Sequence, residues 1–172
     1  MKKRLITLAL MAVMCMSAFA QLQGQWTKAD VPGDELTETE AYTAYTYQDK
    51  IGAFVCFGWD SPEFRLVTNK GVFEESVYYT GFGESHAVKV LAGIYDLSAD
   101  KVDLVERFNI FMDVEKSSLG DKITINPGSL KREKKKALKI MNALTKPKTV
   151  VRFICNRYGE GSFDMLVPSY RY

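Results

Sequence analysis

The chain has 172 residues, of which 47% are hydrophobic and 26% are charged. This length corresponds to roughly one domain, which excludes a multidomain assembly, and the hydrophobic fraction excludes a wholly disordered chain. Three cysteines and one histidine are too few for a disulfide-dense scaffold, and they exclude most metal sites and acid–base schemes that need several such side chains. We therefore predict no cofactor.

The first 20 residues have the three parts of a secretory signal. A basic start at 2–4 precedes an apolar run over 5–16, and the sequence Ala-Phe-Ala at 18–20 has the small-x-small pattern of a signal peptidase site. The apolar run of about 12 residues is too short to cross a bilayer as a helix, so we expect no transmembrane span. We expect 1–20 to be a cleaved signal peptide and 21–172 to be a single β-rich domain, exported to the periplasm or secreted.

Removal of the signal changes the charge balance. The whole chain has 23 basic and 21 acidic residues, and the signal contains three of the basic ones and no acid, which leaves 20 against 21. The mature chain lacks the bulk positive charge that attracts nucleic acid, so we expect no nucleic-acid partner. The remaining basic residues are concentrated at 129–148, where eight of them accompany one acid.

Most of the mature chain is predicted to form β-strands. Tyr and Thr are abundant at 40–47, residues 51–59 are apolar on both faces, and residues 86–95 and 104–112 alternate in polarity. Turn signals recur between these segments, and Asn69-Lys70-Gly71 predicts a hairpin. The strands are predicted at 40–47, 51–59, 64–68, 72–79, 86–95, 104–112, 122–126, 149–156 and 162–167. About nine strands with short turns predict a mainly β fold, an antiparallel β-sandwich or a barrel-like fold.

One amphipathic helix is predicted before the C-terminal hairpin, with Ser129 as its N-cap and Pro147 as its stop. Its apolar residues fall within an arc of about 160° on a helical wheel, and among the cations of the helix Lys134 alone lies inside that arc. The apolar residues are Leu130, Ala137, Leu138, Ile140, Met141 and Leu144. The cations on the opposite face include Lys131, Arg132, Lys135, Lys136 and Lys139. This face is either a solvated surface or a patch for an anionic partner, such as lipid headgroups, an acidic polysaccharide or an acidic protein.

Cys56 and Cys155 are the cysteines that remain after cleavage, and both lie in predicted strands. An even count in an exported chain is consistent with a disulfide, which requires the two residues to lie on neighbouring strands or facing sheets. The alternative is two buried thiols that act as small hydrophobic side chains.

Other chemistry-bearing residues do not form a recognisable site. Ser85 and His86 are adjacent in a strand and so point to opposite faces, which excludes a Ser–His pair. An acidic segment over 30–40 lacks the spacing of a calcium-binding loop. Aromatic side chains near strand ends either cover the open ends of the core or stack on sugars and protein partners. These aromatic residues are Tyr42, Tyr45, Tyr47, Trp59, Tyr78, Tyr79 and Phe82.

The order of segments resembles a known group of proteins. An export signal is followed by an apolar strand with Cys56, a hairpin that begins at 64–68, a Lys-rich amphipathic helix and the segment 149–158. This layout resembles small exported β-sandwich domains of unknown function from Gram-negative envelopes, and it is similar to that of some periplasmic accessory proteins of type VI secretion. The resemblance implies a sandwich fold and no catalytic residues.

Two hypotheses about function follow from the sequence. The first is an exported non-enzymatic protein that binds a protein or glycan partner through its aromatic loops or its basic helix face. The alternative is a hydrolase that acts on an envelope or dietary polymer through carboxylates. A deep cleft lined by two or more facing carboxylates favours the hydrolase, whereas shallow surface grooves favour the binding protein.

Overall fold

The structure, a computed structural model, describes most of the mature chain. The described residues are 24–33, 40–68, 73–80, 83–98, 101–116, 123–158 and 161–170. The predicted signal peptide lies outside these ranges. Within them, no helix is long and apolar enough to cross a membrane.

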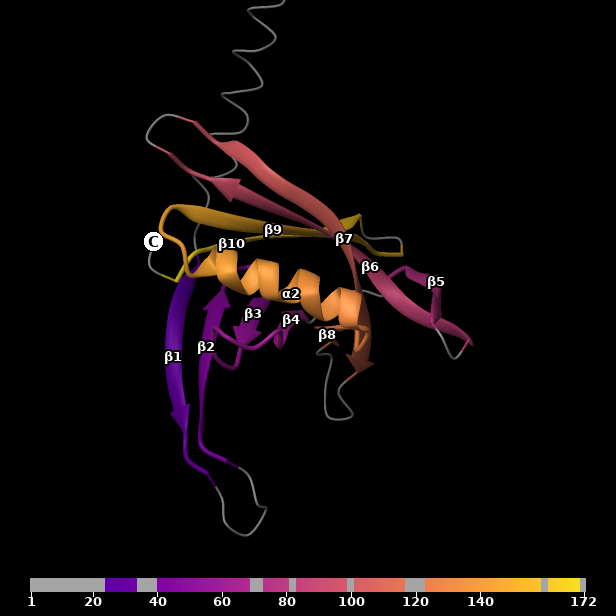
Figure 1. Cartoon of the computed structure of the whole chain (residues 1–172), viewed down its shortest axis with the longest axis horizontal. Coiled ribbons are helices and arrows are strands. Elements are labelled where there is room, and N and C mark those ends of the chain that lie inside the picture. The colour runs from indigo at the N-terminus through magenta and orange to yellow at the C-terminus, as the bar shows by residue number, and fades with distance from the viewer. Residues whose placement is uncertain are drawn as a thin grey trace, which may run out of the picture.

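In the described parts of the chain, ten strands form one antiparallel sheet, and one helix, α2, lies against it (Figure 1). The order across the sheet is β1-β2-β3-β4-β8-β7-β6-β9-β10, and β5 pairs with the first part of β6. The elements are β1 (Gln25–Val31), β2 (Tyr42–Gln48), β3 (Ala53–Cys56), β4 (Phe64–Thr68), β5 (Glu75–Thr80), β6 (Gly83–Asp96), β7 (Asp103–Lys116), β8 (Ile123–Pro127), α2 (Lys131–Leu144), β9 (Thr149–Asn156) and β10 (Ser162–Pro168).

The predicted mainly β, antiparallel fold with one helix before the last hairpin is confirmed, but its details differ. The described strands belong to one open sheet and not to the two packed sheets of a sandwich. The tenth strand is β1, which the sequence analysis missed because most of its side chains are exposed and carry no apolar alternation. The predicted hairpin between 64–68 and 72–79 is wrong, since β4 pairs with β3 and β8 whereas β5 pairs with β6.

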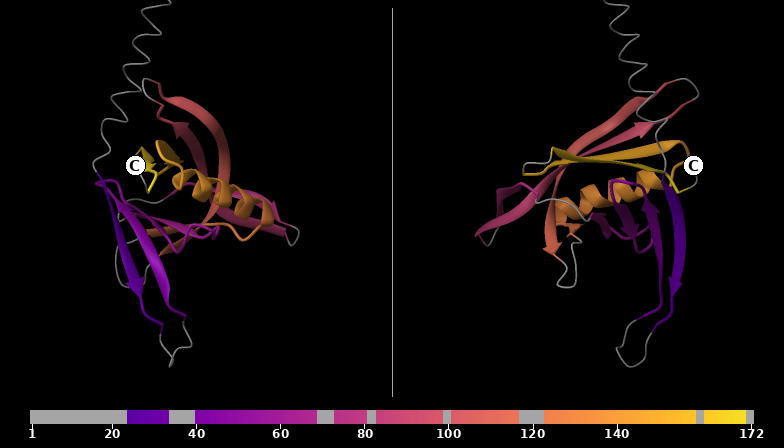
Figure 2. Two further views of the ribbon diagram at one scale, coloured as in Figure 1. Left: turned by 60° about the vertical axis from the view of Figure 1, so that its left-hand side comes forward. Right: turned by 180° about the vertical axis from the view of Figure 1, so that it is seen from behind.

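The sheet curls around its own inner face into a half-barrel (Figure 2). Phe153 of β9 lies 6.0 Å from Phe54 of β3 and 5.7 Å from Phe64 of β4, as measured between ring centroids, although these strands are far apart in the sheet order. At the two edges, the Trp26 indole N–H donates to the carbonyl oxygen of Pro168 at 3.1 Å. This contact brings the ends of β1 and β10 together without a strand ladder, so the barrel stays open.

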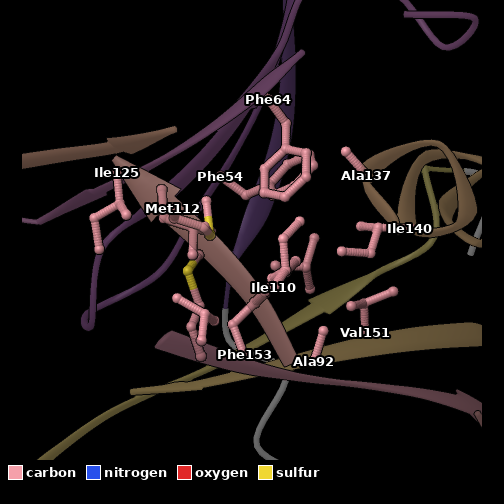
Figure 3. Close-up of a cluster of buried hydrophobic side chains, with 14 of the residues drawn as sticks. Phe54, Phe64, Ala92, Ile110, Met112, Ile125, Ala137, Ile140, Val151 and Phe153 are labelled. Carbon is pink, nitrogen blue, oxygen red and sulfur yellow. The ribbon is translucent and has the colours of Figure 1, made fainter. Parts of the chain in front are cut away.

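The apolar face of α2 fills the concave side of the sheet. Ala137 and Ile140 point toward the core side chains Phe64, Ile110 and Val151 (Figure 3), and all five are buried. The alternating apolar residues of the strands supply the opposite wall, so one continuous core joins helix and sheet. The free energy gained by this burial, about 25 cal/mol per Å² of apolar surface, holds the helix in place.

The helix is rotated relative to the predicted wheel. Ala143, outside the expected arc, is buried, whereas Leu138 and Lys134, inside it, are half-buried and exposed, so the buried face lies to one side of that arc. The predicted N-cap is also wrong. Leu130, not Ser129, occupies the N-cap position, and it makes no side-chain capping hydrogen bond.

Candidate functional site

The predicted basic face of α2 divides into paired and unpaired cations. Arg132 Nε and Lys136 Nζ each lie 3.1 Å from Oε1 of Glu133. Lys139 pairs with Glu106 of β7 through its Nζ. The other two predicted residues, Lys131 and Lys135, are exposed and have no ion-pair partner among the residues that the structure describes, and the same holds for Lys134. The free positive charge therefore lies on the first two turns of the helix.

Glu133, the single acid of this segment, is fully buried. Its Oε2 accepts the backbone N–H of Phe111 at 2.9 Å, and the Phe111 carbonyl oxygen accepts the N–H of Gly128. The pairing of β7 with β8 begins at Met112, so Phe111, the residue before it on β7, has no paired residue on β8. The carboxylate thus takes the place of a strand neighbour at this edge. The helical wheel places Glu133 within the apolar arc, and this position in the sequence could have indicated that its side chain is buried.

A pocket of about 330 Å³ opens where β8 ends and α2 begins. Its apolar surface comes from Phe57, Pro62, Phe64 and Pro127. The Phe57 ring is held between Tyr42, with centroids 5.6 Å apart, and the Arg65 guanidinium, 4.9 Å from the ring centroid. These contacts fix the aromatic wall of the pocket.

The backbone after β3 sets the direction of that wall. Gly58 has φ of 108°, a conformation that side chains with a Cβ rarely adopt. The turn at Gly58 places Phe57 at the pocket and Trp59 in a separate aromatic cluster, with the Tyr45 ring 5.0 Å away. Phe57 and Trp59 therefore lie in two different parts of the molecule, although only Gly58 separates them in the chain.

Charged side chains of both signs surround the pocket. The carboxylates are Glu63, Asp113 and Glu115, and the cations are Arg65 and Lys134. The ion pairs found in the described part of the chain include none of these five residues. Burial, and then repulsion from Glu115, raise the pKa of Asp113 above its usual value. The pocket therefore contains a carboxylate whose charged form is poorly solvated and lies beside a like charge.

Cys56 and Cys155 are free, buried thiols, and no disulfide is seen among the described residues. Cys56 lies on β3, whose neighbours are β2 and β4, whereas Cys155 lies on β9, whose neighbours are β6 and β10. A bridge was expected to require neighbouring strands or facing sheets; the two cysteines are not on neighbouring strands, and the described strands form one sheet. Burial raises the pKa of each thiol to about 12. A thiol that stays protonated at neutral pH is a poor nucleophile.

We expect both thiols to resist modification in the folded protein. Ellman's reagent at pH 8 should react slowly with the mature chain, and unfolding in urea without reductant should then release the full signal of two thiols. A native protein that reacts within seconds would contradict the burial of these side chains. Unfolded protein with no titratable thiol would instead demonstrate a Cys56–Cys155 disulfide.

The structure also describes His86 and several of the aromatic residues that the sequence suggested as functional candidates. His86 is exposed on β6, opposite Val77 of β5. Tyr47 is buried in the core, whereas Tyr45 and Trp59 are half-buried in a cluster with Trp26 and Tyr170. Ring centroids in this cluster are 5.0 to 5.7 Å apart, so these aromatic residues pack on each other over the seam between β1 and β10.

The remaining sequence candidates are only partly described. Tyr42 is exposed and packs on Phe57. The side chains of Tyr78 and Tyr79, the residue Phe82 and most of the acidic segment over 30–40 lie outside the described parts of the chain. Within those parts, no group of three or more His, Cys, Asp or Glu side chains is arranged to hold a metal ion. Comparisons with protein-family models, with curated proteins and with solved structures find no match to this chain.

Proposed function

We propose that the chain is an exported, non-enzymatic binding protein that holds an acidic partner, a protein or a glycan, against the first two turns of α2. The observation that carries this proposal is the set of three exposed cations, Lys131, Lys134 and Lys135, without partners among the described residues. The other cations of α2, Arg132, Lys136 and Lys139, contact Glu133 or Glu106. A basic group left unpaired beside neutralised neighbours is available to an external anion.

Two further features support the proposal. Lys131 lies in the first helical turn, where a cation opposes the helix dipole, so its charge is not explained by helix stability. The export signal pattern at 1–20 and the resemblance in layout to small exported envelope domains favour a role outside the cytoplasm. There, carboxylate-bearing proteins and glycans are the expected acidic partners.

The basic face predicts salt-sensitive binding to an acidic polymer. We expect the mature chain to bind poly-L-glutamate or polygalacturonate and to lose at least about tenfold in affinity between low and physiological salt, because exposed charges are screened over about 8 Å. Replacing Lys131, Lys134 and Lys135 together with Gln should abolish binding. Stability should change by less than about 0.5 kcal/mol per site. Fluorescence titration measures the first effect and urea unfolding measures the second.

A matched variant separates a specific face from bulk charge. Replacing Lys50, Lys101 and Lys146 with Gln removes the same charge from exposed positions away from the first two turns of α2. This variant should bind as the parent does. Equal loss in both variants would mean that only net charge matters, and unchanged binding in both would make the helix face a solvated surface. Comparison of the two polymers distinguishes a protein from a glycan partner.

The pocket beside β8 favours one second candidate, the carboxylate-dependent hydrolase. Asp113 and Glu115 line the same pocket, and the raised pKa of Asp113 is the property that a general acid needs. The mature chain would then release reducing ends or amino groups from purified peptidoglycan or dietary polysaccharide, and Asp113→Asn would abolish the release. Equal release by the parent and the Asn variant, or none from either, would exclude this function.

A further inference from the structure

The pocket between β4, β7, β8 and α2 has the features of a small-molecule site, and of the three unpaired cations on α2 it includes Lys134 alone. Its volume of about 330 Å³ lies at the lower end of the range for ligand pockets. Its walls come from segments far apart in the sequence, because β4 and β8 are neighbours only through the sheet order. The pocket is thus a product of the fold and not of one loop.

The charges around this pocket do not form ion pairs with one another. By contrast, Arg152 and Asp164 on the last two strands do form one. Around the pocket, Arg65 instead stacks on Phe57, and no ion pair joins it to Asp113 or Glu115. Both signs of charge therefore face one cavity without neutralising each other.

Each sign can serve a different part of one ligand. Asp113 and Glu115 lie two residues apart on β7, and burial and then repulsion from Glu115 disfavour the charged form of Asp113, so an ammonium group between the two carboxylates would relieve the repulsion. Arg65 and Lys134 supply donors for a carboxylate. The rings of Phe57 and Pro127 offer an apolar surface between these groups. The lining thus combines a site for a cation, a site for an anion and an apolar wall.

We propose that this pocket binds a small zwitterion, a free amino acid or a molecule of similar size with an ammonium group and a carboxylate on one apolar body. The ammonium group contacts Asp113 and Glu115, and the carboxylate contacts Arg65. A ligand with one charge leaves either the carboxylates or the cations without a partner, so it gains less on binding. The proposal does not depend on an acidic partner at the helix face.

Three ligands of one shape test the proposal directly. L-phenylalanine carries both charges, phenethylamine carries only the cation and 3-phenylpropanoate carries only the anion. In an amide NMR titration of the mature chain, L-phenylalanine should shift the signals of Phe57, Arg65, Asp113 and Asn126. Its affinity should exceed that of either analogue by at least about tenfold. D-phenylalanine and the other free L-amino acids, tested in the same way, show which configuration and which side chain the pocket prefers.

Two variants and two controls locate the site. Asp113→Asn and Arg65→Gln should each weaken amino-acid binding by at least about tenfold. Asp103→Asn and Lys101→Gln remove one charge of each sign from exposed positions that do not line the pocket, and they should leave binding unchanged. Equal affinity for either single-charge analogue, equal loss in the controls, or no shift from any amino acid at about 10 mM would overturn the proposal.

Discussion

Replacing Phe153 with alanine should lower the free energy of unfolding by about 3–5 kcal/mol. The side chain is fully buried, and its ring packs against both Phe54 and Phe64 from the opposite part of the sheet. Truncation therefore removes apolar contact and leaves a cavity where the two ends of the curled sheet meet. Aromatic contacts of this kind add about 0.5–1.5 kcal/mol beyond their buried area.

Urea unfolding of the mature chain measures this loss, and Ile154→Ala is its matched control. Ile154 follows Phe153 on β9, but it is only half-buried and lines a different, shallow pocket with Lys89 and Asn109. We expect the control to cost less than half as much as Phe153→Ala. Equal costs would mean that the centre of the core does not lie between β3, β4 and β9.

The elements that the sequence predicted well are those set by local signals. The last hairpin was expected at 149–156 and 162–167, and the structure has β9 and β10 at Thr149–Asn156 and Ser162–Pro168. Fully buried residues alternate with less buried ones along most of both strands, and Gly161, with φ of 75°, lies just before β10. Both the period and the turn are properties of neighbouring residues, so a single sequence contains them.

Strand pairing between distant segments was not predictable in the same way. β4 and β8 pair from Leu66↔Ile125 to Thr68↔Ile123, across more than 50 residues of chain. A sandwich and a curled single sheet demand the same alternation of buried and exposed residues, so the pattern alone does not distinguish them. The contact between Phe54 and Phe153 that defines the curl depends on the accumulated twist of the whole sheet.

In the candidate site, too, local features were predictable from the sequence, whereas contacts between distant segments were not. The excess of cations on the helix was visible in the sequence, but their ion pairs were not, because Glu106 lies on β7 and 33 residues away from Lys139. The pocket was also not predictable, since Arg65 and Asp113 are brought together only by the pairing of β4, β8 and β7. The hydrogen bond from the Phe111 N–H of β7 to the Glu133 carboxylate of α2 was not predictable either, because the two residues are 22 positions apart in the chain.

The hydrogen bond between Phe111 and Glu133 is the basis of the second large expected loss of stability. Glu133→Ala should lower the free energy of unfolding by about 2–4 kcal/mol, because the buried N–H of Phe111 loses its acceptor and a cavity replaces the side chain. Arg132 and Lys136 moderate the loss. Their side chains are 54% and 28% exposed, so water can solvate the charges that the carboxylate leaves behind.

Glu133→Gln separates the two roles of the carboxylate. Glutamine keeps the volume and a carbonyl acceptor for the Phe111 N–H, but it loses the negative charge that Arg132 and Lys136 contact. We expect it to cost about 1–2 kcal/mol, clearly less than alanine. Hydrogen exchange of the Phe111 amide measures the local effect. In the alanine variant, the protection of this amide from exchange should fall to near that of an exposed strand edge. In the glutamine variant, its protection should remain largely intact. Equal losses of stability in both variants, with Phe111 protected in each, would show that the ion pairs within α2, and not the hydrogen bond from Phe111, account for the stabilisation by Glu133.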